Sequence, residues 1–173
     1  MRNFLPVAIF SVAVILVYTL FATEYVPEME PQAPPPRETA MDVSAMTTGE
    51  LVDFGRTVFE GKGACALCHE PVGGRAPLLD DIMAVSRERL KDPGYTGSAG
   101  DAVGYVVESM TDPSAFVVPG YAVPGTDGRE SPMPSVESPE IGLTRGEVLA
   151  VTAYLQGLSG EEVTVEIDKG GGR

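Results

Sequence analysis

The two cysteines and the one histidine of this 173-residue chain fall within a single run of five residues, Cys65-Ala66-Leu67-Cys68-His69. This pattern is typical of covalent haem attachment, in which the thiols bond to the two vinyl groups and the histidine binds the iron. A redox-active dithiol shares the Cys-x-x-Cys spacing, and a structural zinc site would need a carboxylate as its fourth ligand. We favour covalent haem, because the pattern uses both cysteines and the histidine at once.

A second ligand of the iron would have to be a methionine or come from outside the chain, because there is no other histidine. Met133 stands between Pro132 and Pro134, whose rings restrict the backbone and can aim one thioether. Met83 and Met110 fall on apolar helical faces, where a methionine more often fills the core. We therefore expect Met133 as the ligand, with Met110 or an open site as the alternatives.

Short helices must position these residues. Two segments begin with the spacing of a capping box, from Thr47 to Glu50 and from Thr144 to Glu147. Each continues with apolar residues at intervals of three and four, which predicts helices that end near Gly61 and Gly160. These two helices flank the Cys65–His69 motif and Met133 along the sequence.

Two further helices are expected between them, at residues 101–110 with Asp101 as the cap and at residues 80–90. The segment 113–139 holds six prolines, so it can form neither a long helix nor a central strand. A segment of this length without regular secondary structure in a compact domain usually takes part in function or encloses another group.

The N-terminus carries an uncharged run from Phe4 to Thr23, long enough to span a bilayer as a helix. We favour a retained anchor over a cleaved signal peptide, because Leu20 would occupy an unsuitable position for cleavage after Ala22. Arg2 before the run and acidic residues after it predict a cytoplasmic N-terminus. The expected organisation is an anchor at 1–23, a proline-rich acidic linker at 24–44, a domain at 45–160 and a flexible tail at 161–173, in which residues 163–167 could form an edge strand.

The chain is strongly acidic, with 25 acidic against 12 basic residues. This balance argues against nucleic-acid binding, which depends on Lys and Arg. Residues 45–160 alone hold 16 acidic and 8 basic residues. This negative charge would attract the basic surface of a partner protein, or it would only keep the domain surface well solvated. The sequence has no free catalytic cysteine, no histidine outside the motif and no phosphate-binding glycine loop, so we expect no enzyme.

The domain resembles a class I, monohaem cytochrome c over about 115 residues. The resemblance implies an all-α fold of about four short helices around one covalently bound haem. It further implies that Gly55 and Phe59 cross Val151 and Tyr154, and that the Pro77 carbonyl accepts a hydrogen bond from His69. The chain has no tryptophan, which many relatives place near a haem propionate, so Tyr95, Tyr105 or Tyr121 could serve instead. The matching segments are residues 55–59, 65–69, 76–79, 106–110 leading into Tyr121, 131–134 and 149–158.

The resemblance and the apolar N-terminus together predict a single-pass protein of the cytoplasmic membrane with its haem domain on the periplasmic, outer face. We expect an electron carrier that serves as a shuttle between respiratory or photosynthetic complexes or as a subunit of one. Its expected partners are the membrane and redox proteins, with no small-molecule substrate. The expected haem c site comprises Cys65, Cys68, His69, Met133 and Pro77, with His69 and Met133 on the iron.

Two other haem functions are alternatives. A gas sensor or other ligand-binding protein would have a labile or absent sixth ligand, and the Pro132-Met133-Pro134 setting argues against it. A peroxidase would usually need a second haem or a distal histidine, and the sequence has neither a second attachment motif nor a second histidine.

Overall fold

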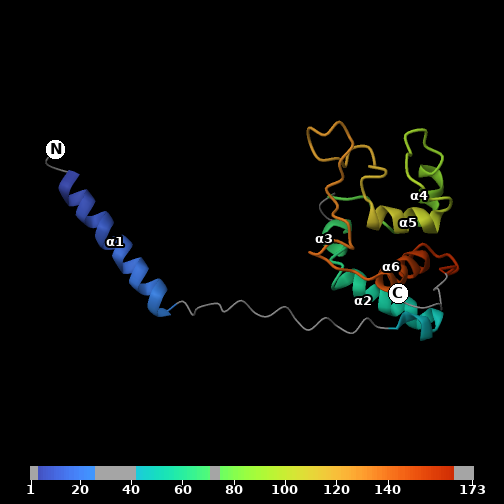
Figure 1. The fold of residues 1–173 in the computed structure, drawn as a ribbon, viewed down its shortest axis with the longest axis horizontal. Helices are drawn as coiled ribbons and strands as arrows, with labels where there is room; N and C mark the ends of the chain where they lie inside the picture. The colour runs from blue at the N-terminus through green and yellow to red at the C-terminus, as the bar shows by residue number, and fades with distance from the viewer. Residues whose placement is uncertain (1–3, 26–41, 71–74, 166–173) are drawn as a thin grey trace. The chain divides into compact units, whose positions relative to one another are not determined.

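The computed structural model describes residues 4–25, 42–70 and 75–165. It divides the chain into two compact units, Met1–Thr39 and Ala40–Arg173. The described residues form the helices labelled in Figure 1 and no β-strand. The expectation of an all-α protein with one apolar N-terminal helix is therefore confirmed for these residues. Arg2, most of the expected linker (26–41) and the end of the expected tail (166–173) lie outside the described residues.

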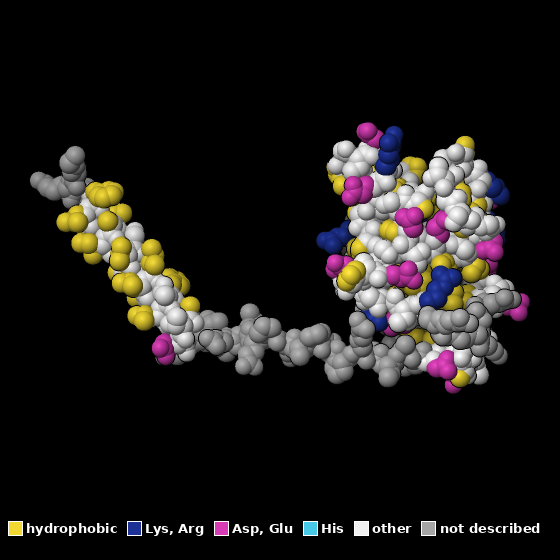
Figure 2. All heavy atoms as spheres, viewed as in Figure 1, with side chains coloured by type: hydrophobic (Ala, Val, Ile, Leu, Met, Phe, Trp, Pro, Cys, Tyr) yellow, Lys and Arg dark blue, Asp and Glu magenta, His cyan; other side chains and the backbone are white. Residues whose placement is uncertain are grey.

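The first unit contains one helix, α1 (Phe4–Tyr25), whose 22 residues extend about 33 Å at helical rise. Its hydrophobic side chains cover it from end to end, as Figure 2 shows. The stretch Phe4–Glu24 is long and apolar enough to cross a membrane, a property that a retained anchor and a signal sequence share.

In the second unit, helices α2 (Thr48–Glu60) and α6 (Arg145–Leu158) begin where the capping boxes predict. The Thr47 hydroxyl accepts a hydrogen bond from the Glu50 backbone N–H at 3.3 Å, and the Glu50 carboxylate accepts one from the Thr47 N–H at 2.8 Å. Thr144 and Glu147 make the same reciprocal pair at 3.3 and 2.6 Å. Both boxes satisfy N–H groups that have no partner within the helix.

Helices α2 and α6 pack closely because α2 has a glycine at their crossing. A Cβ atom added at Gly55 would lie 1.9 Å from the carbonyl oxygen of Ala150 and 3.0 Å from the Cβ of Tyr154. One turn further along α2, the ring of Phe59 packs on the ring of Tyr154 with centroids 5.4 Å apart. Val151 is fully buried in the same cluster as Phe59. The contacts of Gly55 and Phe59 with Tyr154 are those that the cytochrome c resemblance implied, whereas the backbone that Gly55 approaches is that of Ala150 and not of Val151.

Two shorter helices complete the core. Helix α4 (Ile82–Arg89) buries Ile82, Met83 and Ser86, and packs against α5 and α6. Helix α5 (Ala102–Thr111) begins where Asp101 predicts, since the Asp101 carboxylate accepts a hydrogen bond from the Gly104 N–H at 2.7 Å. The structure thus confirms the helices that the sequence predicts at residues 80–90 and 101–110.

The segment between α5 and α6 contains no helix or strand, as its prolines predict. It is anchored at Val136, which is almost completely buried. The Val136 N–H donates to the Met110 carbonyl at 2.9 Å, and the Val136 carbonyl accepts from the Leu143 N–H at 2.8 Å. This pairing holds the preceding residues 131–134 beside the end of α5.

The N-terminal boundary of the folded unit lies earlier than residue 45. Val43, which the sequence places in the linker, begins the 3₁₀ turn η1 (Val43–Ala45) and is buried. It packs in a second core cluster with Leu51, Ala150 and Ala153. One buried valine after a proline-rich stretch gives no periodic pattern, so the sequence did not indicate this contact.

The C-terminal residues 161–165, which were expected to belong to a flexible tail, are hydrogen-bonded to α6. The buried side chain of Gln156 donates to the Thr164 hydroxyl at 2.9 Å and accepts from the Thr164 N–H at 3.2 Å. Glu161 forms an ion pair with Arg87 of α4 at 2.5 Å. Residues 161–165 form no strand, and residues 166 and 167 of the expected edge strand lie outside the described residues.

The close contact at Gly55 predicts that alanine substitutions at two glycines of α2 change the free energy of unfolding by very different amounts. Gly55→Ala should lower the free energy of unfolding by about 1–3 kcal/mol, because its methyl group meets backbone that cannot rotate away. Gly49→Ala is the matched control, since nothing lies within 4 Å of its added Cβ, and it should be neutral or stabilising by up to about 1 kcal/mol. Urea unfolding of the full chain in non-ionic detergent, followed by circular dichroism, measures both, and equal effects would contradict the close crossing.

Candidate functional site

The cysteines and the histidine project from one short turn. After α2, the Cys65 N–H donates to the Phe59 carbonyl at 3.0 Å, and the helical turn α3 (Ala66–His69) follows, with the His69 N–H donating to the Cys65 carbonyl at 3.0 Å. Ala64 has a φ of 51°, in the left-handed region, which costs a non-glycine residue roughly 1–2 kcal/mol. The surrounding hydrogen bonds hold this strained residue at the entrance to the motif.

The two cysteines lie in different environments. Cys68 is exposed, whereas the half-buried Cys65 donates its thiol hydrogen to the Gly63 carbonyl over 3.6 Å. Burial raises the pKa of the Cys65 thiol to about 11. Because the thiolate is the nucleophile, this raised pKa makes Cys65 itself unreactive near neutral pH.

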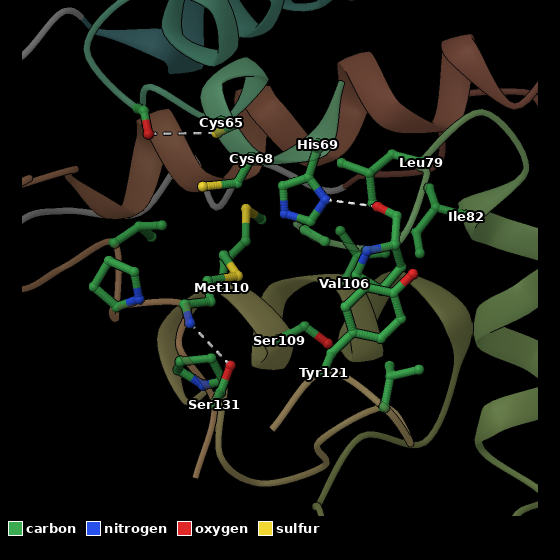
Figure 3. A pocket seen from close by; sticks show the side chains of 18 of the residues that line it. Cys65, Cys68, His69, Leu79, Ile82, Val106, Ser109, Met110, Tyr121 and Ser131 are labelled. Carbon is green, nitrogen blue, oxygen red and sulfur yellow. Dashed lines mark hydrogen bonds between the residues drawn. The ribbon is translucent and has the colours of Figure 1, made fainter. Parts of the chain in front are cut away.

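His69 is oriented by a backbone carbonyl. Its Nδ1 lies 2.8 Å from the carbonyl oxygen of Pro77, and both residues are half-buried. Because a carbonyl oxygen only accepts, Nδ1 donates the hydrogen of this bond, and Nε2 is the ring nitrogen left to bind a metal. Figure 3 shows the second ring nitrogen of His69 facing the cavity. This is the hydrogen bond that the resemblance implied for Pro77.

The motif opens on a cavity of about 540 Å³ inside the folded unit. Its volume falls within the range of about 300–1,000 Å³ that is usual for cofactor and ligand sites. The walls come from the end of α2, from α3, α4, α5 and α6, and from the connecting segments before α4 and between α5 and α6. Most of the lining is apolar, including Leu79, Ile82, Val106, Val118, Val136 and Leu155.

Two methionines line this cavity. Met133 is half-buried, and its N–H donates to the Ser131 hydroxyl at 3.1 Å. Met110 is buried, and Figure 3 shows its side chain turned towards the same cavity as Cys68 and His69. Met83 is buried in the core and is not among the lining residues. The structure therefore brings the expected ligand and its first alternative to one site and excludes Met83 from it.

Of the three tyrosines expected near a haem propionate, two line the cavity and one packs behind its wall. Tyr105 and Tyr121 line the cavity, whereas Tyr95 lies behind the wall with its ring centroid 5.9 Å from that of Tyr105. Phe116, another lining residue, packs against both Tyr95 and Tyr105. Tyr105 and Tyr121 are therefore the tyrosines whose position suits contact with a bound group.

Glu108 fixes Tyr95 from the outer face of α5. The Tyr95 hydroxyl donates to the Glu108 carboxylate, which also accepts from the Ser98 N–H at 2.5 Å and the Ser98 hydroxyl at 2.8 Å. Burial alone would raise the pKa of Glu108, but these hydrogen bonds outweigh it and hold the pKa below its ordinary value. Burial and the bond to Glu108 raise the pKa of Tyr95. The hydrogen bond to the Glu108 carboxylate thus fixes Tyr95, which packs against the cavity-lining rings of Tyr105 and Phe116.

Sequence reasoning missed both charged residues of the described cavity lining, Arg75 and Arg89. Arg89 could have been found, because it follows Ile82 by seven and Ser86 by three residues and so shares the buried face of α4. Arg75 stands in an irregular stretch before Pro77, where no periodicity exists to reveal which way a side chain points.

The described residues hold no group of three or more His, Cys, Asp or Glu side chains placed to bind one metal ion. Cys65, Cys68 and His69 themselves therefore do not converge on a common point, and the described part of the chain adds no carboxylate to them. This arrangement argues against the zinc alternative, which needs four converging ligands.

No protein-family model and no curated protein matches the chain.

The residues at the site suit a covalently attached haem. Two thiols and an imidazole project from one helical turn, the imidazole turns its second ring nitrogen towards the cavity, and a thioether of either methionine can reach the same space. Most of the remaining lining is apolar, which suits a large flat aromatic group. Cys65 and Cys68 would hold such a group by thioether bonds, and His69 and Met133 would hold its iron.

The difference between the two thiols can be measured on chain made without a haem-attachment system. Because its raised pKa keeps Cys65 protonated, iodoacetamide should modify it much more slowly than the exposed Cys68 at pH 8. The rate at Cys65 should rise only as the pH approaches about 11. The folded protein is labelled for increasing times and then digested, and mass spectrometry of the peptides gives the modification rate of each cysteine. Equal rates at pH 8 would contradict the burial of Cys65.

Proposed function

We propose that this protein is a membrane-anchored c-type cytochrome that carries single electrons through one covalent haem. The observation that carries the proposal is the His69–Pro77 hydrogen bond beside the two thiols. It presents Nε2 of His69 to an apolar cavity that both Met110 and Met133 line. The all-helical architecture of the folded unit and the close crossing of α2 and α6 add support.

Each residue of the site has a distinct task in this proposal. Cys65 and Cys68 form the two thioether bonds, so the cofactor cannot dissociate. Pro77 holds the Nδ1 proton of His69, which fixes the ring orientation and raises the basicity of Nε2. Met133 supplies the second ligand. Haem supplies a one-electron couple, and His/Met ligation raises its reduction potential.

The surroundings favour electron transfer over substrate chemistry. With His69 and Met133 both holding the iron, no position would be left for a substrate, and the described residues of the cavity wall offer no second histidine as an acid or base. Apolar side chains keep water from the buried part of the site. Leu67, between the two cysteines, lines the cavity and is 75% exposed, so the cavity reaches the protein surface there.

Helix α1 would anchor the carrier in the cytoplasmic membrane, with the N-terminus in the cytoplasm and the haem domain on the periplasmic side. A tether of this kind raises the concentration of the carrier near membrane-bound redox complexes. The partners would be respiratory or photosynthetic proteins, reached as a shuttle or as a fixed subunit. The acidic folded unit would favour basic partner surfaces.

An optical spectrum of the full chain, made with a haem-attachment system and held in detergent, tests the proposal. We expect covalent low-spin haem, a weak far-red sulfur–iron band in the oxidised form, and no change when carbon monoxide is added to the reduced form. Carbon monoxide binding would favour the gas-sensor alternative, in which the sixth ligand is labile. Absence of covalent haem would refute the proposal.

Replacing each cavity methionine with leucine identifies the second ligand, because this change removes the thioether and keeps the volume. Met133→Leu should lower the reduction potential by on the order of 100 mV and allow carbon monoxide to bind. Met110→Leu is the matched control, since Met110 lines the same cavity, and it should leave the far-red band intact. The opposite pattern, with the effects at Met110, would show that the ligand is assigned to the wrong residue.

A further inference from the structure

The backbone around Met133 belongs to no helix or strand and is held by serine side chains. Proline has no N–H group, so Met133 carries the one backbone donor of the run Pro132-Met133-Pro134. This N–H donates to the Ser131 hydroxyl at 3.1 Å, the bond drawn beside Ser131 in Figure 3. The Ser131 N–H in turn donates to the Ser114 hydroxyl at 3.2 Å. Two hydroxyl groups therefore fix the backbone that carries the Met133 side chain.

The hydrogen bond between Met133 and Ser131 lies at the wall of the cavity. Both residues are half-buried, and both line the cavity. A half-buried N–H that loses its acceptor costs free energy, because it has already given up bonds to water. The other end of this stretch is fixed at Val136, whose N–H donates to the Met110 carbonyl at 2.9 Å. The Ser131 hydroxyl thus holds the backbone at Met133 itself.

We propose that the Ser131 hydroxyl is a positioning group that holds the Met133 thioether in the cavity and so controls how readily an outside ligand replaces it. This inference rests on the proposed function, in which Met133 binds the iron. When Met133 leaves the iron, its segment is free to move and its N–H can bond to water. Removing the Ser131 hydroxyl leaves the N–H without its acceptor only while Met133 is in place, so the removal favours the released state.

The net strength of one hydrogen bond sets the size of the effect. Loss of an acceptor of ordinary strength shifts an equilibrium of this kind by about fivefold. An outside ligand binds only while Met133 is released, so its apparent dissociation constant falls as the released fraction rises. Ser131→Ala should therefore lower the apparent dissociation constant for imidazole by about fivefold.

Titration of the oxidised, haem-loaded full chain with imidazole in detergent measures this constant. The pH is slightly alkaline, so that imidazole is uncharged. Loss of the far-red sulfur–iron band reports the replacement of Met133. Ser131→Thr keeps a hydroxyl and should match the wild type, whereas Ser131→Val has nearly the same shape without the hydroxyl and should match Ser131→Ala.

Two further variants test whether the effect is specific. Ser135→Ala is the matched control, since Ser135 is half-buried in the same segment but does not line the cavity, and it should leave the constant unchanged. In a Met133→Leu chain no thioether is present at this position, so adding Ser131→Ala should not change imidazole binding, which is followed there at the main haem absorption band. Comparison of the two backgrounds isolates the part of the effect that acts through Met133.

Three results would overturn the inference while leaving the proposed function intact. An unchanged constant in Ser131→Ala and Ser131→Val would show that the hydroxyl does not hold Met133. An equal shift in Ser135→Ala would show that any change in this segment has the same effect. A shift that persists in the Met133→Leu chain would show that the hydroxyl acts on the cavity and not through Met133. A wild-type chain without covalent haem or without the far-red band would instead contradict the proposed function itself.

Discussion

The close approach of α2 and α6 at Gly55 is the constraint on which the rest of the folded unit depends. It brings the end of α2 against the middle of α6, so that Phe59 packs on Tyr154 and the chain leaves α2 beside the cavity. Lys62, in the loop that follows, bonds to Glu147 of α6 at 2.8–2.9 Å. The capping carboxylate of one helix therefore also fixes the loop that leads into the cysteine motif.

The folded unit places its apolar side chains around a cavity as well as in a core. Phe59, Val151 and Leu155 belong to the main core cluster and also line the cavity. Filling the cavity with a large apolar group would bury further apolar surface, at roughly 25 cal/mol for each Å² removed from water. The fold and the occupied site would thus stabilise one another, because any ligand that binds only the folded state adds to stability.

Local patterns in the sequence predicted local structure well. Capping residues gave the starts of α2, α5 and α6, and the six prolines excluded regular structure between α5 and α6. Contacts between distant segments left no such pattern. The burial of Val43, the bonds of Gln156 to Thr164 and the ion pair of Arg87 with Glu161 join residues whose neighbours in sequence do not reveal them. The cavity could not be predicted for the same reason, because its walls come from segments spread between residues 59 and 155.

The site also shows why a cysteine motif alone does not define a chemistry. The same spacing serves dithiol exchange when a thiol is exposed with a lowered pKa, and metal binding when the ligands converge. Here burial raises the pKa of Cys65, and the described ligands do not converge on one ion. The imidazole is instead held by the Pro77 carbonyl with its second nitrogen facing apolar space. A histidine ring oriented in this way, beside two thiols at the edge of an apolar cavity, suits the attachment of an apolar cofactor.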